Sequence, residues 1–368
     1  MKVGLMARSL RPPITGIGRY TFNLASSIAE HLEPDVLTLY VTREVKDLRG
    51  IRCRKVVAPV PTPHEVFRAA WEQTLVPYSA RRDGLDVFHS PNYTLPLGLP
   101  CPSVVTVHDL AFLDRRFHKA RLRLYLTLLT KMSLRRADRI IAVSDYTRRE
   151  VERHFPFTVG KVSVVYSGLD PAFRNGSSAV AGGPPAASDK PYVLFVGSLE
   201  PRKNLPRLIR AFEHAMLDTG LPHELVLCGP WGWRYRPVKE ALARSPMRQR
   251  IRHLGYVPSA DLPSLYAGAD LLAYPSLDEG FGFPVIEAMA SGTPVLTSDR
   301  SALPEVAGGA AVTVTPTDEG AIAKGIVSVL SDQDLANSLV ERGRERSAEF
   351  TWERAAAETV EIYRQAVG

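Results

Sequence analysis

Residues 278–287 read DEGFGFPVIE, and this stretch decides the fold that we expect for the chain. It follows an apolar run, 271–275, which predicts a buried strand. It leads into a helix that Pro284 can start and Gly292 can stop. A strand, a glycine-containing loop and a helix in this order form an edge at which α/β proteins bind ligands.

The sequence of this loop predicts an anion site with a glutamate on either side. The backbone amides of Phe281 and Gly282 precede the helix, where unpaired N–H groups and the helix dipole favour an anion. Glu287 can accept two hydrogen bonds from a vicinal diol, and Glu279 can reach a sugar. The pattern fits a nucleotide-sugar, whose diphosphate lies between a ribose and a hexose. The alternative is that both glutamates are solvated residues of a helix start, which the dipole also favours.

Strands alternate with helices along the whole chain, which predicts an α/β protein with parallel sheets covered by helices. With 368 residues, the chain suits two domains that each bury a core. Residues 175–190 are rich in glycine, serine, proline and alanine without an apolar period, so we expect a flexible linker there. The expected first domain is 1–174, the second is 191–350, and 351–368 form a final helix.

The three cysteines are widely spaced, without a CxxC pair or clustered histidines, so we expect reduced thiols, no metal site and no cofactor. The N-terminal apolar run is too short for a signal peptide, and no later run reaches membrane-spanning length. These features predict a cytoplasmic protein.

The net charge of +7 and the pI near 9.3 call for an anionic partner, and we expect no nucleic acid. The segment 115–139 carries nine lysines and arginines interleaved with apolar residues, which predicts an amphipathic helix with basic flanks. Such a helix could lie against acidic lipid headgroups, as a peripheral contact at the inner face of the membrane. The alternative is an ordinary core helix with a solvated basic face.

The first domain offers polar groups at a helix start and at strand ends. Gly16 and Gly18 open a helix and would let a phosphate or sugar approach the backbone. His108 and Asp109 follow one predicted strand and Asn92 follows another. His108 could hydrogen-bond a sugar hydroxyl, and Asp109 could fix the tautomer of His108 or bind the acceptor, as Asn92 could. The alternative for His108 is a strand-end capping role.

A nicotinamide-dependent dehydrogenase or a nucleotide-sugar epimerase of Rossmann type is disfavoured. The dinucleotide fingerprint lacks its third glycine, since Thr21 stands in its place, and no acid closes the next strand. A Tyr-x-x-x-Lys pair suited to such an enzyme is not evident either.

The second domain begins with a strand, 191–197, whose exit loop carries Arg202 and Lys203. Adjacent cations at this place suit a diphosphate, because lysine is a movable point charge and arginine can fork to two oxygens. Residues 253–258 predict a later strand, and Tyr256 and Val257 at its end could hold a base by stacking and backbone hydrogen bonds, although Tyr256 could equally be a core residue.

These motifs, taken in chain order, resemble the retaining glycosyltransferases of family 4, and the resemblance covers essentially the whole chain. It implies a GT-B fold of two facing Rossmann-like domains, with the donor in the cleft and helix 351–368 crossing back to the first domain. The most specific motif is the pair Glu279 and Glu287 with seven residues between them.

The resemblance also implies residue roles. Lys203 and Arg202 would bind the donor diphosphate, Glu279 the transferred sugar, and His108 would contact that sugar near the reacting carbon. The other implied donor contacts are Gly16, Gly18, Tyr256, Val257, Phe281, Gly282, Phe283 and Glu287. Ser198 stands where many relatives carry arginine, so Arg202 is expected to supply that charge.

The expected activity is transfer of a hexose, with retention, to a glycan, a lipid-linked or a small-molecule acceptor without a required metal ion. The His-Asp-Leu motif at 108–110 and the Glu-Pro-Arg-Lys-Asn motif at 200–204 resemble those of bacterial mannosyl- and polysaccharide-assembly enzymes, which favours GDP-mannose over UDP-sugars. A non-catalytic nucleotide-sugar-binding or scaffold protein is the alternative from another class.

Overall fold

The computed structural model describes residues 1–11, 16–32, 36–45, 48, 50–58, 65–114, 120–174 and 190–368. The expected linker therefore lies, apart from Lys190, outside the described residues, as does the start of the basic segment, 115–119. Packing divides the chain into two compact units, Met1–Gly168 with Thr351–Gly368, and Leu169–Phe350.

The first unit is built on a seven-stranded sheet whose strands are all parallel. Its strands, in their order across the sheet, are β3 (Arg54–Val57), β2 (Leu37–Val41), β1 (Val3–Met6), β4 (Val87–Ser90), β5 (Ser103–Val107), β6 (Arg139–Ala142) and β7 (Val162–Val164). The four residues of β1 and the five of β5 are all buried, as expected for central strands covered on both faces. The carboxyl ends of the strands therefore meet at one edge.

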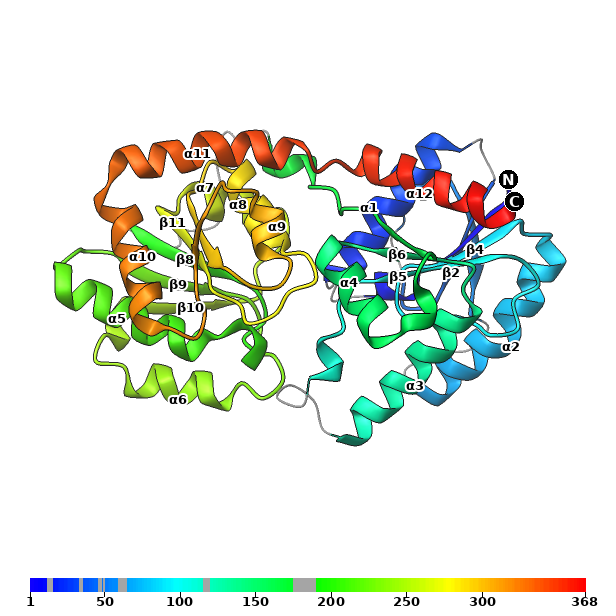
Figure 1. Cartoon of the computed structure of the whole chain (residues 1–368), viewed down its shortest axis with the longest axis horizontal. Helices are drawn as coiled ribbons and strands as arrows, with labels where there is room; N and C mark the ends of the chain where they lie inside the picture. The colour runs from blue at the N-terminus through cyan, green and yellow to red at the C-terminus, as the bar shows by residue number, and fades with distance from the viewer. Residues whose placement is uncertain are drawn as a thin grey trace. The chain divides into compact units, whose positions relative to one another are not determined.

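Helices cover this sheet, and Figure 1 shows α1 and α12 side by side over it. The helices of the unit are α1 (Gly16–His31), α2 (Glu65–Asp83), α3 (Ala120–Arg136), α4 (Asp145–His154) and α12 (Trp352–Val367), with 3-10 turns η1 (Arg8–Leu10), η2 (Ala111–Leu113) and η3 (Pro156–Thr158). Thr351 caps α12 by accepting a hydrogen bond from the Arg354 amide (3.1 Å).

A buried polar chain anchors α12 to the sheet of the first unit. Tyr363 of α12 is hydrogen-bonded to Nδ1 of His89 (2.6 Å), and Thr106 to Nε2 of the same ring (2.8 Å). His89 is fully buried, and burial, aided by His108, lowers its pKa to about 3. Trp352, at the start of α12, packs edge-on against Tyr20 of α1 (5.6 Å between ring centroids). The last helix in the sequence is thus part of the core of the first unit.

The second unit has a six-stranded parallel sheet. Its strands, in their order across the sheet, are β10 (Ile251–Gly255), β9 (Glu224–Cys228), β8 (Tyr192–Val196), β11 (Leu271–Tyr274), β12 (Val295–Ser298) and β13 (Val312–Val314). Around them lie η4 (Pro171–Phe173), η5 (Pro201–Lys203), α5 (Leu205–Thr219), α6 (Arg236–Arg244), η6 (Arg248–Arg250), α7 (Leu262–Ala267), α8 (Phe283–Ala290), α9 (Leu303–Ala307), α10 (Glu319–Ser331) and α11 (Gln333–Ala348). The two Rossmann-like sheets expected from the sequence are confirmed.

The first part of the first unit ends at Gly168, earlier than the expected boundary at 174. The reason is local hydrogen bonding: the Leu169 amide donates to the Phe350 carbonyl (3.0 Å), and the Arg174 guanidinium donates to the same oxygen (2.9 Å). Residues 169–174 therefore pack with the second unit.

Candidate active site

The candidate site of the second unit lies where the strand order reverses direction. β8 and β11 are neighbours in the sheet although two strands separate them in sequence, which makes the gap between them a topological switch point. The loop after β8 carries Arg202 and Lys203, and the loop after β11 carries Glu279. Parallel pairing brings these two loops to the same edge, so residues far apart in sequence meet there.

Glu279 is the centre of a hydrogen-bonded network. One carboxylate oxygen accepts from Lys203 Nζ (2.6 Å), from the Ser276 hydroxyl (2.6 Å) and from the Tyr274 hydroxyl (2.8 Å). The other oxygen accepts from the Arg202 guanidinium (2.6 Å). The glutamate is only 6% exposed, so its charge is compensated by these partners rather than by water.

The electrostatics of the network keep Glu279 ionised. Burial by itself would raise the pKa of this carboxyl, but the charges of Arg202 and Lys203, with the hydrogen bonds to Lys203 and Ser276, outweigh burial and hold it at about 2. Burial lowers the pKa of Lys203 below its usual value, although Glu279 opposes this. Burial and the nearby Glu279 charge raise the pKa of Tyr274 well above its usual value, so this hydroxyl stays a donor.

Backbone contacts fix the two loops against each other. The Leu277 amide donates to the Arg202 carbonyl (2.8 Å), and the Arg202 guanidinium donates to the Asp278 carbonyl (2.8 Å). Asn204 adopts the left-handed conformation (φ 62°), and its side-chain amide donates to the carbonyls of Pro275 (3.0 Å) and Pro316 (2.6 Å). The cations are therefore presented from a rigid turn.

Gly282 needs the conformation that glycine allows. It is the N-cap of α8 with φ 114°, and a Cβ there would lie 2.7 Å from a methyl of Leu303. Phe281 is buried, and its ring packs edge-on against Phe283 (5.3 Å) and Phe350 (5.6 Å). The chain thus turns tightly into the N-terminus of α8, beside Glu279.

Glu287 lies within α8 and is 1% exposed. Its carboxylate accepts a hydrogen bond from the Tyr266 hydroxyl (2.8 Å). Tyr256 and Val257 follow β10, which ends at Gly255 rather than at the expected 258. Tyr256 is 58% exposed, so it is not a core residue. Its role toward a base stays a prediction.

In the first unit, His108 and Asp109 follow β5, and Asn92 follows β4. Nε2 of His108 lies 3.1 Å from the Pro91 carbonyl, which can only accept, so Nε2 carries the hydrogen. Burial lowers the pKa of His108, which favours the neutral ring. The hydrogen-bond partner that sets this tautomer is therefore Pro91, not Asp109 as was one expectation.

The other polar groups of the first unit make local contacts. A carboxylate oxygen of Asp109 accepts from the Ala111 amide (3.1 Å), and the side-chain oxygen of Asn92 accepts from the Tyr93 amide (2.8 Å). Gly16 is the first residue of α1 and exposed, with open space where a Cβ would stand, whereas Gly18 is buried in the same helix. The roles of these four residues toward a donor or an acceptor stay predictions.

Sequence reasoning missed Tyr274 and Ser276, which complete the shell around Glu279. Tyr274 ends the buried strand β11, and Ser276 precedes Glu279 by three residues. The sequence did contain a signal for them, because both hydroxyls lie within five residues of Glu279, at or just after a strand end.

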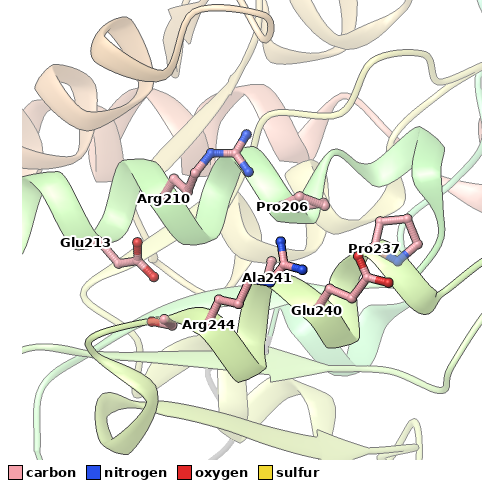
Figure 2. A pocket seen from close by; sticks show the side chains of 8 residues that line it. Pro206, Arg210, Glu213, Pro237, Glu240, Ala241 and Arg244 are labelled. Atoms are coloured by element: carbon pink, nitrogen blue, oxygen red, sulfur yellow. The ribbon is translucent and has the colours of Figure 1, made fainter.

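A separate hollow of about 400 Å³ lies between α5 and α6, and Figure 2 shows charged side chains of the two helices facing one another across it. Arg210, on α5, is paired with Glu319 (2.9 and 2.5 Å). The hollow shares no lining residue with the Glu279 network, so we assign it no part in the site.

Two Rossmann-like units, with the second carrying a carboxylate and two cations at its switch point, place the protein in the GT-B class. A family model described as glycosyl transferases group 1 matches residues 182–346, and one described as glycosyltransferase family 4 matches residues 14–173. The chain is 31% identical over 391 residues to the O-antigen chain mannosyltransferase B of Escherichia coli, over 99% of this chain and 100% of that protein. The chain therefore belongs to glycosyltransferase family 4.

Solved structures agree on the fold. A sucrose-phosphate synthase from Thermosynechococcus elongatus matches with a TM-score of 0.80 at 21% identity, over 99% of this chain and 98% of that one. Anabaena HepE, solved in complex with UDP and glucose, matches with a TM-score of 0.74 at 19% identity, over 98% and 99% of the two chains. The expected GT-B fold class is confirmed.

Proposed function

We propose that this glycosyltransferase moves a hexose from a nucleotide-diphosphate sugar to a glycan, lipid-linked or small-molecule acceptor with retention of configuration, and that mannose from GDP-mannose is the preferred hexose. The observation that carries the proposal is the buried Glu279, held ionised by Arg202 and Lys203 at the switch point. The full-length similarity to a relative named as a mannosyltransferase supports mannose, and a UDP-sugar is the second choice.

The resting network is balanced in charge, because Arg202 also pairs with Glu200 (3.3 Å). Two cations, Arg202 and Lys203, thus face two carboxylates, Glu200 and Glu279. We infer that the donor diphosphate takes over part of the hydrogen bonding of these cations, which frees Glu279 to bind hydroxyls of the hexose. Such an exchange keeps both buried cations paired in the free and in the bound state.

Bond breaking would place negative charge on the departing nucleotide diphosphate. Arg202, Lys203 and the N-terminus of α8 would stabilise that charge, and this preorganised electrostatic effect would supply most of the rate enhancement. The acceptor hydroxyl would attack the same face of the sugar from which the leaving group departs. His108 would contact the sugar near the reacting carbon. Glu287 would bind the ribose, Tyr256 and Val257 the base, and Gly16 and Gly18 the phosphate.

The direct test is nucleotide release from GDP-mannose, UDP-glucose and UDP-galactose by the wild type and by Glu279→Ala. We expect turnover by the wild type with GDP-mannose, a loss of about 100- to 1000-fold in the variant, and persistence of the wild-type activity in EDTA. NMR of the product anomer tests retention. Equal, null release by both proteins with every donor, together with donor binding, would identify a non-catalytic binding protein instead.

A peripheral contact with an anionic membrane stays a prediction. No described helix is long and apolar enough to cross a membrane. α3 buries little of its apolar surface and exposes Leu124 and Leu128 among basic residues, so its surface is not that of an ordinary core helix. Cosedimentation with vesicles tests the contact: binding that requires anionic lipid supports it, and equal recovery with neutral vesicles or none contradicts it.

A further inference from the structure

The first unit contains a groove between α2 and α3 that the proposed donor site does not use. It has a volume of about 410 Å³. One wall is apolar, and its members are Leu95, Leu97, Leu122, Tyr125, Leu126, Leu129 and Met132. The polar end carries Arg8, Arg68 and Glu72. The groove therefore changes from hydrocarbon-like to charged along its length.

The polar end continues into a second hollow of about 240 Å³, with which it shares Arg8 and Arg68. This hollow is also lined by Arg11 and Asn92, and most of its lining follows β1, β2 and β4, with Ile17 of α1 and Arg68 of α2 completing it. It thus lies at the carboxyl edge of the sheet, where α/β proteins bind ligands. The apolar groove and the hollow at that edge are therefore neighbours, with Arg8 and Arg68 between them.

The charges at the junction favour an anion. Glu72 accepts hydrogen bonds from the Arg8 guanidinium, which also donates to Thr94 (2.7 Å), and Arg68 lies 3.8 Å from the same carboxylate. Two arginines, Arg8 and Arg68, thus face one carboxylate, and Arg11 adds a third guanidinium to the lining of the second hollow. A guanidinium fork suits the oxygens of a phosphate ester.

The apolar wall favours a hydrocarbon chain. Leu122, Tyr125 and Met132 are 46%, 53% and 48% exposed at the groove, so a ligand there would remove a large apolar area from water. A nucleotide-sugar offers no such chain, so the ligand is not the donor. α3 carries one lysine and four arginines but no acid, which adds to the attraction for an anionic amphiphile.

We infer that this groove binds the acceptor, and that the acceptor is an amphiphile whose hydrocarbon chain lies between α2 and α3 while its phosphate ester is bound at Arg8, Arg11 and Arg68. The inference rests on the proposed function in one respect, the identification of the ligand as the acceptor. Chain binding and sugar transfer are separate measurements, so the two ideas fail separately.

The test is calorimetric titration of the whole chain, without donor, using dodecyl phosphate and octyl phosphate below their micelle concentrations, inorganic phosphate and dodecyl maltoside. Each buried methylene adds up to about fourfold in affinity, so we expect dodecyl phosphate to bind at least about tenfold more tightly than octyl phosphate. Inorganic phosphate should bind most weakly, and the neutral maltoside more weakly than dodecyl phosphate.

α3 offers a matched pair of variants. Leu122 lines the groove and Leu124 does not, yet both are leucines of the same turn, 46% and 62% exposed. Leu122→Gln should weaken dodecyl phosphate binding about tenfold, and Leu124→Gln should leave it within about twofold. Arg68→Gln should weaken both alkyl phosphates and spare the maltoside, with Arg81→Gln on α2 as its control. Thermal unfolding checks that each variant is folded.

Three results would overturn the inference: affinity that does not depend on chain length, equal losses in the two leucine variants, or inorganic phosphate binding as tightly as dodecyl phosphate. The second result would assign the apolar face to a flat lipid surface, and the third would leave a small-anion site. If affinity depends on alkyl chain length but the protein releases no nucleotide from any donor, the groove inference stands and the proposed function is refuted. If the protein releases nucleotide but its affinity does not depend on alkyl chain length, the proposed function stands and the groove inference is refuted.

Discussion

In each unit, cations in the loop after the first strand pair with a glutamate. The two clusters differ in the number of side chains around the glutamate and in the space beside them. In the second unit, Arg202 and Lys203 follow β8 and meet Glu279, which has four hydrogen-bonded side chains around it. In the first unit, Arg8 follows β1 and meets Glu72 of α2 at the border of two hollows. Both glutamates are 6% exposed, but members of the first-unit cluster also line two hollows. We call the cluster beside these hollows open and the other closed.

The difference shows how the same sheet position can serve two kinds of anion binding. The closed cluster is balanced, with two cations and two carboxylates, so an incoming anion must exchange with a partner that is already bound. The open cluster has an excess of arginine around Glu72, so an anion can be added without exchange. We therefore expect damage at Glu279 to cost much more than damage at Glu72.

Glu279→Gln should have the largest effect. Removing this charge leaves the buried Lys203 without its carboxylate partner and leaves Arg202 with Glu200, and we expect the free energy of unfolding of the second unit to fall by about 3–5 kcal/mol. Urea unfolding measures this loss. Glu319→Gln is the control, since it breaks an exposed pair with Arg210, and its cost should stay within about 1 kcal/mol. Similar costs for the two variants would remove the distinction between closed and open clusters.

Acid should weaken the first unit at a higher pH than the second. The pKa of His89 is 6.5 in the unfolded chain and about 3 in the folded one, so between these pH values only the unfolded chain binds a proton at this ring. Stability is lost as the pH falls below about 6.5, by about 2 kcal/mol at pH 5. Glu279, lowered from 4.5 to about 2, contributes fully above pH 4.5 and loses its contribution only between those values.

Hydrogen exchange at pH 7 and pH 5, corrected for intrinsic rates, measures this difference. Amides of β4, β5 and α12 should lose protection at pH 5 while those of β8 and β11 keep it. Earlier opening of the second unit would show that His89 does not control the acid response.

Two glycines at helix starts should respond differently to alanine. Gly282→Ala places a Cβ 2.7 Å from Leu303 at a φ of 114°, and we expect a loss of about 2 kcal/mol in stability. Gly16→Ala meets open space, so its stability should change by no more than about 1 kcal/mol. Thermal unfolding of both variants checks this. If Gly16→Ala keeps its stability but binds donor as tightly as the wild type, the proposed backbone contact with the donor phosphate is wrong.

Glu72→Gln should have the smallest effect. Arg8 and Arg68 line two hollows through which water can reach them when the carboxylate is lost, and we expect a cost of about 1 kcal/mol. The same variant removes a negative charge beside the proposed headgroup site, so dodecyl phosphate should bind more tightly. Weaker binding would mean that Glu72 is needed to hold Arg8 in place. Urea unfolding and calorimetry give the two values.

The sequence was sufficient to predict the strands and the two loops of the switch point, because an apolar run followed by glycine or by paired cations is a local signal. It did not predict the partners of Glu279 on β11, since a hydroxyl at a strand end is equally consistent with a core tyrosine. Long-range pairs were out of reach: Arg8 and Glu72 are 64 residues apart, and His89 and Tyr363 are 274 apart. The end of β10 was placed too late, because Gly255, at φ 70°, turns the chain out of the sheet before Tyr256.

The anchoring of α12 has a consequence for synthesis on the ribosome. The first unit is interrupted by the whole of the second, Leu169–Phe350, and gains Trp352 and Tyr363 only after the second unit has been translated. At ordinary elongation rates this is a delay of roughly ten to forty seconds, during which His89 lacks its tyrosine. A nonsense mutation in the codons for α12 would therefore damage the unit that was translated first.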